Sequence, residues 1–101
     1  MKIIIKNPKE EPYVAEVEDN LETYQKIVGG YIEAIKIGDS QDRILLICNE
    51  EGKLKGLQPN FFISGDTIVG TVFFVGEGEE DFRGLTDDET DKILRWFSCE
   101  K

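Results

Sequence analysis

Short runs of hydrophobic residues, several of them alternating with polar ones, recur along the chain and determine its predicted secondary structure. A β-branched run or a period of two residues is typical of β-strands. The segment 71–75 is the most continuous β-prone run, so we expect it at the centre of the sheet. The first two strands are expected to form a hairpin. Ser64, Gly65 and Asp66 are a turn signal that predicts a second hairpin, between 61–63 and 67–69. The pattern predicts strands over 2–6, 13–17, 31–37, 43–49, 61–63, 67–69 and 71–75.

Two other segments have the spacing of helices. The first follows Asn20, a good N-cap, and its apolar positions are Leu21, Tyr24, Ile27 and Val28. The second begins with the sequence TDDE (86–89), which matches a capping box because a threonine is followed three residues later by a glutamate. We expect this C-terminal helix to present four apolar residues to the core: Ile93, Leu94, Trp96 and Phe97.

These elements predict an α+β fold. A chain of 101 residues is long enough for one hydrophobic core, so we expect a single domain over 1–101. Short strands with helices at two places predict a mostly antiparallel twisted sheet of about five or six strands. One helix follows the second strand, and the other lies at the C-terminus.

Gly29 and Gly30 admit two interpretations. A glycine just past a helix is a common cap, because it adopts positive φ without a Cβ clash. A phosphate-binding loop also uses glycines, but there they follow a strand and precede a helix. Here the predicted order is helix, glycines, strand. The pattern therefore favours a structural end to the helix over a phosphate site.

Negative charge is concentrated toward the C-terminus. The formal net charge is −9, and the window 77–91 has eight carboxylates against Arg83 alone, a charge of −7. Such a chain repels nucleic acid, so we expect no direct nucleic-acid binding. The charge favours a protein partner with a basic surface. The residues predicted to bind it are Glu77, Glu79, Glu80, Asp81, Asp87 and Asp88.

The chain lacks the side chains on which most catalysis near neutral pH depends. It has no histidine, and Cys48 lies in an apolar run where burial raises the pKa of a thiol. A carboxylate-based hydrolase is the least favoured hypothesis, because the sequence indicates no pocket that would bring two acids together. No segment matches a calcium loop. We therefore expect a non-enzyme with no catalytic residue, no metal and no cofactor.

Location is predicted from what the sequence lacks. The longest apolar runs, such as 44–48 and 72–75, are much shorter than the roughly 20 residues of a membrane span. The N-terminus turns polar by Lys6, so it offers no signal peptide. Two cysteines form no disulfide framework and fit a reducing compartment. We expect a cytoplasmic protein without membrane contact.

A second hypothesis is a small-molecule binder. Several polar side chains lie at predicted strand ends or turns, where they can converge on a concave surface. Two of them, Asn49 and Asn60, can equally cap turns through the local backbone, and that alternative stays open. The ligand would be nucleotide-like and captured between two protomers, which makes a homodimer part of this hypothesis. Its candidate residues are Tyr31, Arg43, Asn49, Lys53, Asn60 and Thr71.

Three stretches resemble a known family. They are LETYQKIVGGYIEAI (21–35), ICNEEGKLKGLQPN (47–60) and IVGTVFFVG (68–76). In this order they are similar to the motifs of a family of small bacterial and phage proteins, domain of unknown function 3846. Many relatives carry an arginine after the Pro-Asn pair, where this chain has Phe61. If that arginine contacts a ligand or partner, this chain lacks the contact.

The resemblance implies a biological context more than a mechanism. Such proteins resemble accessory genes of phages, plasmids and gut Gram-positive bacteria, and small acidic phage proteins often bind a host component. The leading hypothesis is a non-catalytic accessory protein of a phage or mobile element that inhibits a defence-related host protein through its acidic C-terminal face. The motif residues carried over are Gly29, Gly30, Tyr31, Glu33, Asn49, Glu50, Glu51, Gly52, Lys53, Asn60, Gly70 and Thr71.

Overall fold

Eight strands and two helices make up the part of the chain that the computed structural model describes, residues 1–38 and 42–99. Six strands form one sheet in the order β2-β1-β7-β4-β3, with β8 paired to β7, while β5 and β6 form a separate hairpin. Every pairing among these strands is antiparallel. The strands are β1 (Lys2–Lys6), β2 (Tyr13–Glu16), β3 (Ile32–Ile37), β4 (Ile44–Asn49), β5 (Pro59–Ile63), β6 (Asp66–Val69), β7 (Val72–Glu77) and β8 (Phe82–Arg83). The helices are α1 (Leu21–Val28) and α2 (Asp87–Cys99).

β7 lies at the centre of the sheet, as the sequence predicts for 71–75. It pairs with β1 on one side and β4 on the other, so that Phe74 lies opposite Ile4 and Leu46. Because side chains alternate along a strand, Phe73 and Phe74 are buried on opposite faces of the sheet. Burying a side chain of this size contributes on the order of 1.5–3 kcal/mol.

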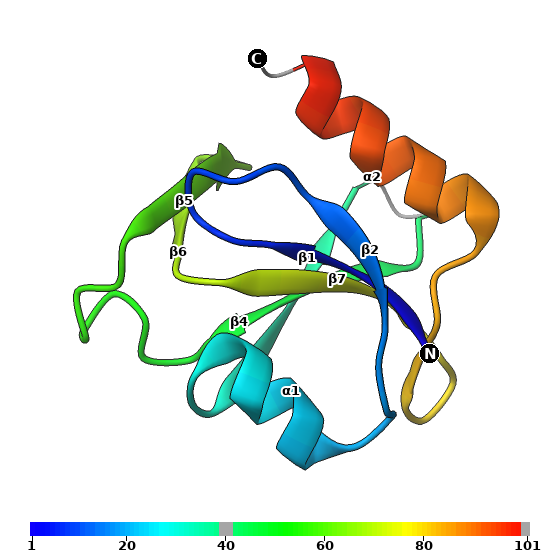
Figure 1. The fold of residues 1–101 in the computed structure, drawn as a ribbon, viewed down its shortest axis with the longest axis horizontal. Coiled ribbons are helices and arrows are strands. Elements are labelled where there is room, and N and C mark those ends of the chain that lie inside the picture. Colours follow the sequence, from blue (N-terminus) through cyan, green and yellow to red (C-terminus); the bar gives the residue numbers. More distant parts are fainter. Residues whose placement is uncertain (39–41, 100–101) are drawn as a thin grey trace.

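The two helices cover opposite faces of the sheet (Figure 1). α1 packs Tyr24 and Val28 on the face that carries Phe73. On the other face, α2 packs beside the β5–β6 hairpin, and the Phe61 and Phe97 rings meet edge to face with centroids 5.1 Å apart. The sheet therefore has one hydrophobic layer on each side, and each layer is closed by one helix.

α1 begins and ends where the sequence predicts. The side chain of Asn20 accepts a hydrogen bond from the Thr23 amide at 2.8 Å. At the other end Gly29 has a φ of +80°, and its amide donates to the Gln25 carbonyl at 2.8 Å. The helix-end interpretation of these glycines is confirmed, and Gly29 holds the left-handed conformation. Gly30 has a different constraint, because a Cβ there would lie 2.8 Å from Nδ2 of Asn49.

The capping box of α2 is also present. The Glu89 amide donates to Oγ1 of Thr86 at 3.1 Å, and the Thr86 amide donates to Oε1 of Glu89 at 2.9 Å. Of the four residues predicted to face the core, Ile93 and Phe97 are buried, while Leu94 and Trp96 are half-buried against the same cluster. The α+β fold class is therefore confirmed, with the predicted position of both helices.

The β5–β6 hairpin is present where the turn signal at 64–66 predicts it. The segments 61–63 and 67–69 pair with each other over longer bounds, and they form a sheet of their own instead of joining the main sheet. Ser64 and Gly65 alone form the turn, with φ of +50° and +79°, so Asp66 begins β6 instead of belonging to the turn. A two-residue turn with two positive φ angles matches the twist of a hairpin. The short strand β8 was not predicted.

Candidate functional site

The β7–β8 turn presents three of the predicted partner-binding carboxylates. The turn closes through Gly78, whose amide donates to the Asp81 carbonyl at 2.9 Å. A side chain on Gly78 would collide with that carbonyl oxygen, so the turn requires glycine. This tight closure leaves Glu79, Glu80 and Asp81 exposed to solvent.

Two of the six predicted carboxylates are paired with lysines. An oxygen of Glu77 lies 3.5 Å from Nζ of Lys36, and Oδ1 of Asp87 lies 2.6 Å from Nζ of Lys2. The hydrogen bond from Lys2 lowers the pKa of the Asp87 carboxyl. Within residues 1–38 and 42–99, no ion pair holds the other four, Glu79, Glu80, Asp81 and Asp88.

Arg83 is the only basic residue within 77–91, and it does not neutralise these four carboxylates. Its Nη1 and Nη2 donate to the two carboxylate oxygens of Glu89 at 2.8 and 2.9 Å. This bidentate pair, which holds β8 to the start of α2, lowers the pKa of Glu89 to about 2. The charge of Arg83 is therefore directed to Glu89, and the neighbouring turn stays negative.

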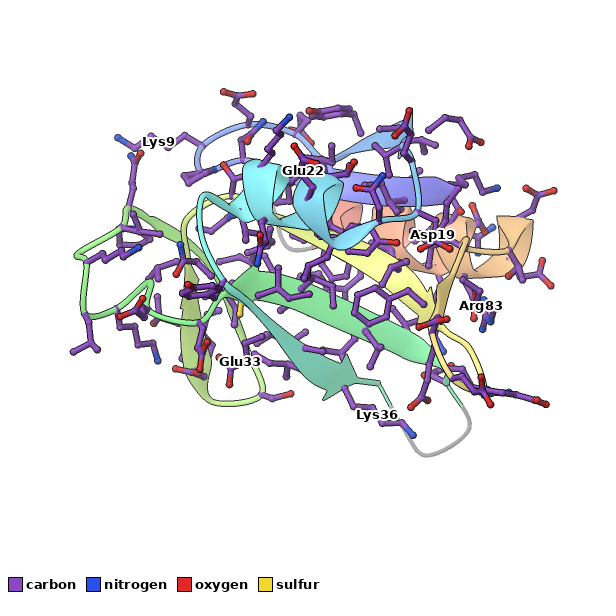
Figure 2. All side chains as sticks on the ribbon, turned by 90° about the horizontal axis from the view of Figure 1, so that it is seen from below. Lys9, Asp19, Glu22, Glu33, Lys36 and Arg83 are labelled. Carbon is purple, nitrogen blue, oxygen red and sulfur yellow. The ribbon has the colours of Figure 1, made fainter. Side chains whose placement is uncertain are left out.

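The fold brings Asp19, from the loop before α1, to the same end of the molecule. Asp19 lines a hollow of about 350 Å³ together with Glu80 and Asp81. Figure 2 shows Asp19 and Arg83 at one end of the molecule and Lys9 at the opposite end. We call this the acidic hollow; its lining residues are Asp19, Asn20, Leu21, Tyr24, Ile32, Glu80, Asp81 and Phe82. We call the six predicted carboxylates together with Asp19 the acidic face.

Aromatic and apolar side chains form the wall of the acidic hollow. The rings of Tyr24 and Phe82 lie 5.4 Å apart, and Leu21 is 54% exposed. The Tyr24 hydroxyl donates to Asp19, and the pKa of this phenol is raised by burial first and by Asp19 and Asp81 next. A hollow with an apolar wall and carboxylates at its edge suits a lysine or arginine side chain, which has an apolar stem and a cationic end.

Asp19 is not among the residues that the sequence predicts for this site. Its only signal in the sequence is the acidic segment 16–22, which carries Glu16, Glu18, Asp19 and Glu22. Nothing in that segment indicates that it meets the β7–β8 turn, because the contact depends on how α1 is placed against the sheet.

Asn49 lies at a second polar corner, where β4 ends. Its Nδ2 donates to the Val28 carbonyl at 3.2 Å, and its Oδ1 accepts from the Glu51 amide at 2.8 Å. The side chain is buried, and it joins the end of α1 to the turn after β4. The close approach of Gly30 to Nδ2 leaves room for nothing larger than glycine without a shift. Asn49 therefore has the structural role that the sequence allowed as an alternative to ligand binding, since its side chain caps the turn through the local backbone.

Asn49 and Lys53 line a second hollow, of about 310 Å³, between the β3–β4 end of the sheet and β6. Lys53 is paired with Asp66 across this hollow. Cys48 is also in its wall, and burial, followed by the charges of Glu33 and Asp66, raises the pKa of its thiol to about 11. The thiol is therefore protonated near neutral pH and unsuited to act as a nucleophile. We call this the corner hollow.

The other four predicted ligand residues do not line the corner hollow. Tyr31 is close to it in the chain, is 66% exposed, and accepts a hydrogen bond at its carbonyl from the Glu50 amide. Arg43 precedes β4 and Asn49 ends it, so the two lie about 20 Å apart along the strand. These positions separate Arg43 from the other candidates.

Asn60 and Thr71 both bond to residues at the end of β1 or just after it. Asn60 donates to the carbonyls of Lys6 and Gly70 at 2.8 and 2.7 Å, and its Oδ1 accepts from Nζ of Lys6 at 2.9 Å. Thr71 donates to the side chain of Asn7 at 2.7 Å. Burial lowers the pKa of Lys6. These bonds tie β1 to β5 and to the loop before β7, so Asn60 has no donor left for a ligand.

Among residues 1–38 and 42–99, no three cysteine, aspartate or glutamate side chains are arranged to hold a metal ion. In the same part of the chain, no helix has both the length and the apolar composition to cross a membrane. Cys48 and Cys99 are both free thiols.

A comparison with protein families matches residues 1–98 to the family described as Domain of unknown function (DUF3846). Comparisons with curated proteins and with solved structures find no match to the chain. The three stretches that carry the family resemblance converge in the structure, since Glu33, Asn49 and Val69, one from each stretch, all line the corner hollow.

Proposed function

This chain belongs to the DUF3846 family, and we propose that it is a non-catalytic accessory protein of a phage or mobile element that acts by binding a host protein. The proposed partner is a cytoplasmic, defence-related protein with a basic surface, and binding inhibits it. The acidic face is the proposed contact surface. This function needs no catalytic group, metal or cofactor from the chain.

The acidic hollow is the observation that carries the proposal. An acidic surface that serves only solubility needs nothing more than exposed carboxylates. This end of the molecule also has a concave apolar wall beside its carboxylates, as a binding site would. Asp19, Glu80 and Asp81 would meet the cationic end of a lysine or arginine, and Tyr24 and Phe82 would contact its stem. Such a side chain would anchor a basic partner at the centre of the contact.

Electrostatics give the proposal a measurable property. Exposed carboxylates attract a basic surface over distances comparable to the Debye length, which is about 8 Å at physiological salt. Association should therefore be fast at low ionic strength and slower as salt is added. A partner held mainly by apolar contacts would lack this salt dependence.

The test is a triple charge reversal, Glu79→Lys with Glu80→Lys and Asp81→Lys. The tagged protein is used to capture partners from host lysate at low and high ionic strength, and association with the captured protein is then measured directly. The variant should associate more slowly than the unchanged chain, and its rate should depend less on salt, because part of the attracting field is gone.

A matched control separates the acidic face from total charge. Reversing the exposed residues Glu10, Glu50 and Glu51 changes the net charge by the same amount but lies outside the acidic face. This control should retain most of the association rate. If both triple variants behave alike, or if neither changes the salt dependence, the acidic face is a solubility feature and the proposal fails.

The alternative proposal is that the chain binds or sequesters a small, nucleotide-like ligand in the corner hollow. It is favoured by the convergence of Asn49, Lys53 and the family motifs on one concavity. Lys53 is its most informative residue, because it is exposed and its removal leaves the bonds of Asn49 intact.

Thermal unfolding in the presence of nucleosides and nucleotides tests the alternative. A ligand that binds only the native state raises the unfolding midpoint by mass action. The shift should be smaller in Lys53→Met and unchanged in the control Lys9→Met, which removes a lysine that does not line the corner hollow. The absence of any shift with the unchanged chain would exclude this class of ligand.

A further inference from the structure

An apolar pocket of about 300 Å³ opens on the α2 side of the sheet, apart from the acidic hollow and the corner hollow. It lies between α2, the neighbouring ends of β3 and β4, and the turn of the β5–β6 hairpin. Figure 1 shows α2 and this hairpin on the same side of the sheet. We call it the α2 pocket; among residues 1–38 and 42–99 its lining residues are Ile37, Gly38, Asp42, Ile44, Ile63, Ser64, Phe74, Lys92, Ile93, Trp96 and Phe97.

The wall of the α2 pocket belongs to the hydrophobic core. Phe74 and Phe97 are buried, with ring centroids 5.7 Å apart, and Trp96 meets Phe97 edge to face at 4.8 Å. Side chains fixed by packing cannot easily collapse into the space, so the pocket is already formed. A ligand that fills the α2 pocket would gain dispersion contacts with the edges and faces of these aromatic rings.

Among residues 1–38 and 42–99, the polar side chains that line the α2 pocket are Asp42, Ser64 and Lys92. Lys92 donates to Oδ1 of Asp42 at 2.6 Å, which places a neutralised ion pair in the wall. In residues 1–38 and 42–99, no buried side-chain nitrogen or oxygen lacks a hydrogen-bond partner. A charged group inside this space would lose water, and the two charges in the described part of the wall, Lys92 and Asp42, already neutralise each other, so its entry is unfavourable.

We propose that the α2 pocket is a binding site for a small, uncharged aromatic molecule with at most one polar end. The apolar wall selects the aromatic body, and the hydroxyl of Ser64, in the turn of the hairpin, receives the polar end. The volume is at the lower limit of the about 300–1,000 Å³ typical of ligand pockets, which limits the ligand to about the size of two fused rings. The net charge of −9 also disfavours anions.

The test compares two probes with the same aromatic body. 2-Naphthol is uncharged at neutral pH, and 2-naphthalenesulfonate carries a negative charge. Trp96 is the only tryptophan, so its indole N–H gives a single signal in the proton–nitrogen spectrum of labelled protein. We expect 2-naphthol to shift this signal saturably, and the sulfonate to bind about tenfold or more weakly, a difference of about 1.4 kcal/mol.

Two substitutions on β3 provide a matched pair. Ile37→Phe adds volume inside the α2 pocket, whereas Ile35→Phe adds the same volume on the same strand in the wall of the corner hollow. Ile37→Phe should abolish the saturable shift, and Ile35→Phe should retain it. If Ile37→Phe does not fold, Ile63→Phe fills the pocket from the hairpin and replaces it. An absent shift in the unchanged chain, equal binding of the sulfonate, or binding that survives both filling variants would each overturn the proposal.

Discussion

The turn that carries Glu79, Glu80 and Asp81 and the corner around Asn49 are similar in the sequence, since each follows a strand and is rich in polar residues. The structure separates them by how their polar atoms are used. At the corner, the amide of Asn49 is bound to the backbone on two sides. In the turn, the described structure has no ion pair for any of the three carboxylates. Polar groups bound to the backbone specify the fold, whereas those left in water can meet a partner.

Removing the side chain at the corner should have the largest effect. Asn49→Ala leaves the Val28 carbonyl and the Glu51 amide without their partner, so the free energy of unfolding should fall by about 2–4 kcal/mol. Urea unfolding measures this loss. Glu80→Ala, the matched change in the turn, should alter stability by no more than about 0.5 kcal/mol. Equal effects of the two substitutions would remove the distinction between the regions.

The end of α1, which Asn49 supports, should be next in sensitivity. Gly29→Val forces a β-branched residue to a φ of +80° and should cost about 1–2 kcal/mol. No atom lies within 4 Å of a Cβ at Gly29, so the cost comes from backbone conformation alone. Gly29→Asn should cost less, because asparagine tolerates the left-handed region. Unchanged urea midpoints in both variants would contradict a left-handed cap.

The Arg83–Glu89 pair, beside the turn, should give a smaller effect that depends on pH. The folded pKa of Glu89 is about 2, below its ordinary 4.5, so its charge stabilises the fold above pH 4.5 and that contribution is lost as pH falls toward 2. The pair is partly exposed, which limits the contribution to roughly 1 kcal/mol. Glu89→Gln keeps the capping box but should lose this pH dependence. Unfolding measured from pH 7 to pH 2 should show the two proteins converging at the acid end.

The smallest effect on stability is expected from the triple reversal of Glu79, Glu80 and Asp81 to lysine. These side chains contribute little packing, and the variant should unfold within about 0.5 kcal/mol of the unchanged chain. Circular dichroism and urea unfolding give this comparison before any binding is measured. A large loss of stability would show that the turn, like the corner, is part of what holds the fold together.

Local signals in the sequence were sufficient for much of the fold. Asn20 and Gly29 delimit α1, and the pair Thr86 and Glu89 begins α2, because each cap depends only on residues within one helical turn. The central position of β7 followed from its continuous apolar run, since a strand covered on both faces has no polar side. These features are decided by neighbours along the chain.

Features that depend on tertiary placement were not predicted. The separation of β5–β6 from the main sheet depends on where the hairpin packs, and the sequence has no signal for it. Asp19 joins the acidic hollow only because α1 lies against the β7–β8 end of the sheet. For Asn49 and Asn60, the sequence allowed a ligand or a turn, and the partners of their side chains could be known only from the structure.

The central position of β7 also governs the order in which the sheet can assemble. β1 and β4 are neighbours only through β7, which comes late in the chain, whereas β1–β2, β3–β4 and β5–β6 are each joined by a short connection. During synthesis these three hairpins can form as they appear, but their apolar faces stay without a common core until β7 is made. We therefore expect the rate-limiting event in folding to be the insertion of one late strand between two early hairpins, because such a long-range step is slow compared with hairpin closure. A chain interrupted before residue 72 lacks the central strand, so we expect it to expose Ile3, Ile4 and Leu46, which are buried in the complete fold, and to be a substrate for chaperones or proteases.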